Sequence, residues 1–151
     1  MTTRTAAWAA FTTTVLAVLV TASAAQGRPK LHDGSSGFKV RPATILVTGD
    51  GSGWLGGDGY GDVGDYGRIR WTKFRQSGAR GNGRVFVNDC DPDCAGGTFS
   101  NWKAVIRASQ VRKGRFTRLS ASYERDGERV TDRWKLQINS PTYAYWRRLA
   151  R

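Results

Sequence analysis

Residues 102–138, WKAVIRASQVRKGRFTRLSASYERDGERVTDRWKLQI, decide the fold class of this chain. Apolar or small side chains recur at every second position, which is the period of a β-strand with one buried face. The stretch is interrupted at 112–114 (RKG) and 125–127 (RDG), where the residues favour tight hairpin turns. It therefore predicts three antiparallel strands joined by two hairpins.

The same alternation continues toward the N-terminus. Further strands are predicted at 43–48, 68–74 and 84–88, and 80–83 (RGNG) is predicted as a turn. Few segments suit a helix. We expect an all-β fold, an antiparallel β-sandwich or small barrel of about six or seven strands, with 43–151 forming one β domain.

Four tryptophans, Trp71, Trp102, Trp134 and Trp146, have a cation one or two positions later. On a strand, immediate neighbours face opposite ways. Trp71, Trp102 and Trp134 are therefore predicted to fill the core while the cations face water. Val130, Trp134, Leu136 and Ile138 are predicted to share one face. The aromatic residues most available to a ligand are Trp54, Tyr143, Tyr145 and Trp146, although Tyr145 and Trp146 could instead close the sheet.

The first 25 residues have the pattern of a secretory signal peptide. Arg4 precedes an apolar run from Ala9 to Val20, and small residues at 22–24 suit cleavage after Ala24 or Ala25. The run is too short and too polar for a membrane anchor, so no membrane span is expected in the mature chain. We predict a secreted protein, extracellular or associated with the cell wall. Residues 26–42 are predicted to be a flexible tail.

Positive charge is concentrated in the C-terminal half. The chain carries 24 basic and 12 acidic residues, and 94–151 alone holds 13 basic and 4 acidic ones. Such an excess favours binding to polyanions by summed potential and counterion release. The predicted polyanion-binding residues are Arg112, Lys113, Arg115, Arg118, Arg147 and Arg148. The alternative is a soluble, Arg-rich surface without a specific partner.

Two cysteines, Cys90 and Cys94, follow the predicted export signal, so they are expected to form a disulfide. The C-x-x-x-C spacing differs from the C-x-x-C of thiol oxidoreductases, and no histidine lies near to complete a zinc site. Aspartates at 89, 91 and 93 resemble the start of a calcium loop but lack its later glycine and glutamate. We expect them to accept hydrogen bonds from nearby turns.

The Gly/Asp-rich stretch 49–67, GDGSGWLGGDGYGDVGDYG, is predicted to be a loop because it lacks any apolar period. Asp58, Asp62 and Asp65 are its candidate calcium ligands, since carboxylates are the oxygen ligands that calcium prefers. A calcium-binding β-roll would need a repeated motif that occurs here once and imperfectly. Calcium is thus the alternative cofactor hypothesis, and a loop without a ligand is favoured.

No catalytic residue is assigned. His32 is the only histidine and lies in the predicted tail, whereas a general base must be held within reach of its proton. Glu124 and Glu128 flank the turn at 125–127, where charged side chains are usually solvated. A secreted hydrolase therefore ranks third among the functional hypotheses.

The ordered set GDGSGWLGG, GRIRWTKF, RGNGRVFVND with CDPDCAGGTF, and RFTRLSASY resembles a family of small secreted actinobacterial proteins of unknown function. The resemblance covers about 45–138, and NDCDPDCAGG is its most specific part. It implies an exported β domain clamped by a disulfide, and it implies no catalytic or binding residues. We expect a non-enzymatic domain that associates with an anionic cell-envelope polymer or another extracellular partner, with a calcium-binding module as the alternative.

Overall fold

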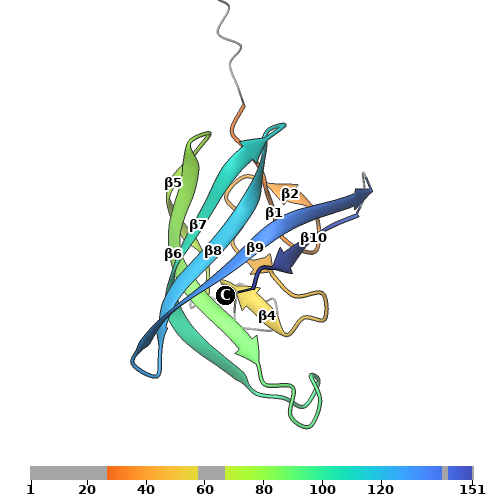
Figure 1. The fold of residues 1–151 in the computed structure, drawn as a ribbon, viewed down its shortest axis with the longest axis vertical. Helices are drawn as coiled ribbons and strands as arrows, with labels where there is room; N and C mark the ends of the chain where they lie inside the picture. Colours follow the sequence, from red (N-terminus) through yellow and green to blue (C-terminus); the bar gives the residue numbers. More distant parts are fainter. Residues whose placement is uncertain (1–26, 58–66, 141–142, 151) are drawn as a thin grey trace, which may run out of the picture.

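The computed structural model describes residues 27–57, 67–140 and 143–150, and these residues form an all-β fold (Figure 1). The main sheet is antiparallel, in the order β10-β9-β8-β7-β6-β4-β3, with β5 pairing with β6 beside this path. The sheet curls until it is nearly closed and barrel-like. A small second sheet pairs β1 with β2. The predicted fold class is confirmed.

The long strands β6 to β9 form most of the main sheet, and the remaining strands are short. Their bounds are β1 Leu31–His32, β2 Phe38–Lys39, β3 Ile45–Leu46, β4 Gly53–Leu55, β5 Arg70–Arg75, β6 Gly78–Asn88, β7 Phe99–Arg112, β8 Arg115–Arg125, β9 Glu128–Ser140 and β10 Tyr143–Arg148. Within the described ranges, no helix has the length and apolar character needed to span a membrane.

Two of the three predicted turns are confirmed. The β7–β8 turn has Lys113 and Gly114 at φ 49° and 71°, and the β8–β9 turn has Asp126 and Gly127 at φ 53° and 79°. Two successive positive φ angles match the right-handed twist of the flanking strands. These hairpins fix the register of β7, β8 and β9.

The predicted turn at 80–83 is wrong, because these residues lie inside β6. Gly81 is buried on the inner face, where an added Cβ would approach Ile69 Cγ2 to 2.9 Å and the Arg70 carbonyl oxygen to 3.1 Å. Glycine in a strand often marks a tight bend or a close approach of another segment. Here it leaves room for residues 69–71, at the start of β5, to pack closely against β6.

The core lies on the concave face of the curled sheet. Ile106, Leu119 and Trp134 are buried there on three successive strands, and Trp71 and Trp102 pack against the same cluster. This confirms the predicted inward position of the three tryptophans. Ile138 shares the face of Trp134 and Leu136, as predicted, because it is paired in register with Ala144, which packs against the core. It is nevertheless 49% exposed, near the end of β9.

The prediction of a flexible tail is wrong for residues 27–42. Leu31 is fully buried, and the Lys30 N–H donates to the Gly114 carbonyl at 2.8 Å. The Trp146 Nε1–H donates to the His32 carbonyl at 3.0 Å, which ties this segment to β10. The polar composition that suggested a tail instead supplies turns and hydrogen bonds. The predicted signal peptide, 1–25, lies outside the described residues.

Candidate functional site

A row of three cations crosses the outer face of the last three strands. Arg118 of β8 is paired in register with Lys135 of β9, which is paired with Arg147 of β10. The residues beside them in sequence, such as Leu119 and Trp146, are buried on the opposite face. Because strand neighbours alternate, the three cations face outward. We call Arg118, Lys135 and Arg147 the basic row.

The basic row is electrostatically unfavourable for the protein alone. Directly opposed residues on adjacent strands lie about 5 Å apart, and like charges at this distance destabilise a sheet. Among the described residues, the ion pairs join Lys39 to Asp33, Arg125 to Asp126 and Arg148 to Asp132, and none includes the row. Arg118 Nε donates a hydrogen bond of 3.3 Å to Gln110 Oε1. The row therefore holds positive charge that an anionic ligand would neutralise.

A shallow hollow of about 410 Å³ adjoins the basic row. Arg118 and Arg133 line it together with the hydroxyls of Ser109 and Ser120. Guanidinium groups and hydroxyls both donate hydrogen bonds to phosphate or carboxylate oxygens. The hollow thus adds neutral donors and a fourth cation to the surface.

Further like-charged pairs lie on the outer face of β6 and β7, where Arg84 is opposed to Lys103. Those two residues and Arg129 line a hollow of about 830 Å³ near the β8–β9 turn, which we call the turn groove. Glu124 also lines the turn groove and is paired in register with Arg129. The groove is therefore cationic, but with a carboxylate inside it.

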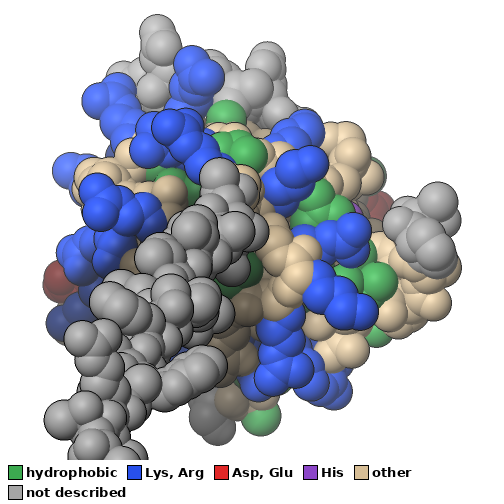
Figure 2. Space-filling view, turned by 90° about the horizontal axis from the view of Figure 1, so that it is seen from above, with side chains coloured by type: hydrophobic (Ala, Val, Ile, Leu, Met, Phe, Trp, Pro, Cys, Tyr) green, Lys and Arg blue, Asp and Glu red, His purple; other side chains and the backbone are tan. Residues whose placement is uncertain are grey.

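Arg112, Lys113 and Arg115 lie at the β7–β8 turn, at the end of the barrel where the N-terminal segment enters. Figure 2 shows Lys and Arg side chains spread over this end, with few acidic ones. Lys113 and Arg115 line a hollow of about 840 Å³ with Lys30, a cation from the segment predicted to be a tail. Arg115 also stacks its guanidinium over the Phe38 ring, 4.2 Å from the centroid.

Arg148 lies on the opposite face of β10 from the basic row, although its side chain is 57% exposed. It is paired in register with the inward Trp134, and its guanidinium donates to the carboxylate of Asp132, whose side chain is 4% exposed. Tyr123 donates its hydroxyl to the same carboxylate at 2.8 Å. Arg148 therefore neutralises a buried charge, which would otherwise be strongly destabilising.

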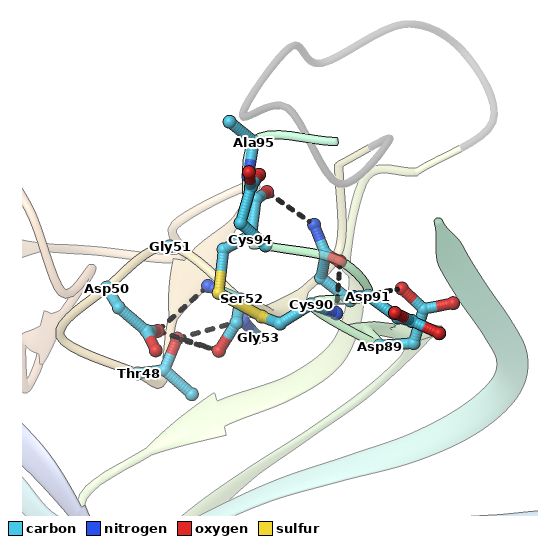
Figure 3. The surroundings of a disulfide bond; sticks show 12 residues. Thr48, Asp50, Gly51, Ser52, Gly53, Asp89, Cys90, Asp91, Cys94 and Ala95 are labelled. Carbon is cyan, nitrogen blue, oxygen red and sulfur yellow. Dashed lines mark hydrogen bonds between the residues drawn. A yellow bond between two sulfur atoms is a disulfide. The ribbon is translucent and has the colours of Figure 1, made fainter. Parts of the chain in front are cut away.

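The two cysteines lie at disulfide distance, with Sγ atoms 2.10 Å apart (Figure 3). Asn88 stabilises the loop between them, because its Oδ1 accepts from the Cys90 N–H and its Nδ2 donates to the Cys94 carbonyl. The Asn88 N–H in turn donates to the Ser52 carbonyl, which links the cysteine loop to the loop 48–53. We call these two loops the loop end.

Two of the three aspartates predicted to form turns in the cysteine loop, Asp89 and Asp93, accept hydrogen bonds from backbone N–H groups. Asp89 Oδ1 accepts from the backbone N–H groups of Asp91 and Thr98, and Asp93 Oδ1 accepts from those of Ala95 and Gly96. Hydrogen bonds from the hydroxyl and N–H of Ser52 lower the pKa of Asp50 to about 2. Each carboxylate thus stabilises its own turn.

The calcium hypothesis stays a prediction, because Asp58, Asp62 and Asp65 lie outside the described residues. Within the described part of the chain, no group of three His, Cys, Asp or Glu side chains is arranged to hold a metal ion.

His32, Asp33 and Ser36 are close together but do not form a serine–histidine relay. The Ser36 hydroxyl donates to Asp33 Oδ2 at 2.5 Å, and His32 Nδ1 accepts from the Gly34 N–H. Burial lowers the pKa of His32. Burial alone would raise the pKa of Asp33, but hydrogen bonds from Lys39 and Ser36 outweigh it and hold that pKa well below its ordinary value. This cluster stabilises the turn between β1 and β2.

The aromatic residues of β10 divide between the two faces. Trp146 is 4% exposed and faces the core, so it closes the sheet rather than contacting a ligand. Tyr143 and Tyr145 lie on the other face with Arg147, since alternate residues of a strand share a face. Their ring centroids are 5.8 Å apart. Trp54 is half-buried, and its Nε1–H donates to the Gly51 carbonyl.

Sequence reasoning identified two members of the basic row and missed Lys135, which joins them. The period-two alternation places each cation on an outer face, but the cross-strand register is needed to show that the three are adjacent. The chain matches no protein-family model, and no curated protein or solved structure matches it significantly.

Proposed function

We propose that this protein is a secreted, non-enzymatic β domain that binds an anionic polymer outside the cell through the outer face of β8, β9 and β10. One observation carries the proposal: three cations are opposed on adjacent strands, and no carboxylate lies between them in register. Such a row lowers the stability of the free protein. A ligand with regularly spaced anions would reverse that effect.

The hollows support the same function. The turn groove contributes cations from β6, β7 and β9, and the barrel end contributes Lys30 and cations of the β7–β8 turn, and all of them raise the positive potential of the molecule. A potential summed over many cations attracts polyanions at long range and is screened by salt. An open, shallow surface suits a polymer better than a small molecule, which is usually enclosed.

Secretion rests on the first 25 residues and on the resemblance to small exported actinobacterial proteins. Export would also allow the cysteine pair to oxidise. Mass spectrometry of the protein from culture medium should give a mature chain beginning at Ala25 or Gln26. An intact N-terminus retained with the cells would contradict export.

Cosedimentation tests the proposed binding. The purified protein is mixed with purified cell walls, and separately with a soluble polyphosphate, across a salt series. We expect binding at low salt that falls steeply as salt rises, because each neutralised anion releases counterions. An equally sized neutral polysaccharide is the control. Absence of binding to every polyanion at low salt would contradict the proposal.

A further inference from the structure

Two tyrosine rings continue the basic row along the edge of the sheet. Tyr143 and Tyr145 lie on the same face of β10 as Arg147, and β10 is the last strand in the sheet order. Tyr143 is 58% exposed, and the two rings are in contact at a tilt of 39°. Trp146, which follows Tyr145 in the sequence, is buried on the opposite face of β10 and so fixes the orientation of the strand. We call the two tyrosines the aromatic shelf.

The spacing of this surface is regular from Tyr145 through the basic row, and the pairing of β10 with β9 shifts register between Tyr143 and Ala144. Side chains on one face of a strand repeat about every 6.8 Å, whereas the row crosses the strands at about 5 Å intervals. A chain-like ligand that follows β10 therefore meets two rings and then the cation Arg147. From there Lys135 and Arg118 extend the positive charge across the sheet.

We propose that the aromatic shelf and the basic row together bind single-stranded nucleic acid. The inference rests on the proposed polyanion binding and specifies its ligand. Arginine pairs with phosphate oxygens through two parallel hydrogen bonds, and tyrosine rings stack on exposed bases. A duplex keeps its base faces inside, and a poly(alditol phosphate) has no rings to stack. A ligand that carries both anions and accessible planar rings uses every part of this surface.

The test compares two oligonucleotides of equal length, oligo(dT) and an abasic strand with the same phosphates but no bases. Binding of the purified protein is followed by fluorescence anisotropy at low salt. We expect oligo(dT) to bind at least about 10-fold more tightly than the abasic strand. Replacing both tyrosines, Tyr143→Ala with Tyr145→Ala, should weaken oligo(dT) binding by about 30-fold, since each stacked base contributes to affinity. The same variant should bind the abasic strand as the wild type does.

The matched control is Tyr143→Phe with Tyr145→Phe, which keeps both rings and should bind oligo(dT) like the wild type. Thermal melting of all variants verifies that they are folded, as expected for an exposed shelf. Equal binding of the two oligonucleotides, or competition by poly(glycerol phosphate) as effective as by oligo(dT), would overturn the nucleic-acid inference and leave polyanion binding intact. Failure to bind either oligonucleotide or any other polyanion would overturn both.

Discussion

The basic row and the loop end use their charges in opposite ways. At the loop end, Asp50, Asp89 and Asp93 each accept hydrogen bonds from nearby backbone N–H groups. In the basic row, cations of adjacent strands are opposed to one another. Charge at the loop end stabilises the fold, whereas charge in the row destabilises the free protein. The difference indicates which of the two regions is suited to a ligand.

The largest expected effect follows from removing the three positive charges of the basic row. The triple variant Arg118→Gln, Lys135→Gln and Arg147→Gln should lose about 100-fold in polyanion affinity at low salt, if each contact contributes about 1 kcal/mol. The slope of log K against log salt should fall by about 2, since each contact to a single strand contributes about 0.7. Titration across a salt series measures both quantities.

The matched control removes the same charge from the turn groove through Arg84→Gln, Lys103→Gln and Arg129→Gln. Its affinity should fall far less, because the proposed ligand lies along β8, β9 and β10, whereas Arg84 and Lys103 lie on β6 and β7. Equal losses in the two triple variants would mean that net charge, rather than the row, determines binding.

The second prediction concerns Asp33, a buried carboxylate whose charge stabilises the fold. Asp33→Asn should lower the free energy of unfolding by about 2 to 3 kcal/mol at pH 7, because it removes the charged partner of Lys39 and Ser36. The pKa of Asp33 is depressed in the folded state, so its contribution is complete above about pH 4 and is lost as pH falls below that value. The difference in free energy of unfolding between the wild type and the variant, measured by urea unfolding, should become smaller as the pH is lowered. A difference that is constant from pH 7 to pH 2 would contradict this role.

The third prediction is that the disulfide contributes to stability and not to polyanion binding. Replacing both cysteines, Cys90→Ser with Cys94→Ser, should lower stability by about 2 kcal/mol, as the chain-entropy model gives for a loop of about five residues. Urea unfolding of the oxidised and reduced wild type provides an independent check. Polyanion affinity should be unchanged, because the cysteines lie at the loop end. A loss of affinity comparable with that of the row variant would contradict the separation of the two regions.

The smallest expected effect is at Asp50, which is exposed. Its pKa of about 2 lies below the ordinary value of 3.8, so its stabilisation is present above about pH 4 and is lost as pH falls through 2. Solvent screening limits the contribution to under about 1 kcal/mol. Asp50→Asn should therefore lower the melting temperature slightly at pH 6 and leave it unchanged near pH 2. A melting temperature equal to that of the wild type at every pH would contradict the hydrogen-bonding role.

Much of the wall of the barrel could be predicted from local patterns. The strands β7, β8 and β9 alternate cleanly, and their turns contain residues that tolerate positive φ. The packing of residues 27–42 against the barrel could not be predicted from the sequence. Few of these residues are buried, and the segment is held by partners distant in the sequence, such as Trp146. The glycines at 81 and 83 misled the turn prediction, because a glycine pattern does not distinguish a reversal of the chain from a bend within a strand.

The candidate site was only partly predictable for a similar reason. The charge excess after Cys94 indicated the cations, and alternation indicated that Arg118 and Arg147 face water. Register across β8, β9 and β10 determines that Lys135 lies between them. That register depends on the β8–β9 turn and on the irregular pairing at Tyr143, neither of which composition reveals. Arg148 was predicted to bind a polyanion, but it pairs with the buried Asp132. Composition alone could not show that partner.

The most direct test of the central claim is NMR mapping of the bound surface. Amide resonances of the ¹⁵N-labelled protein are followed during titration with a short polyanion at low salt. We expect the largest chemical-shift changes at Arg118, Lys135 and Arg147 and at their strand neighbours, and no change in the resonances of residues 88–98. Shifts that are spread evenly over the surface, or concentrated at the loop end, would contradict it.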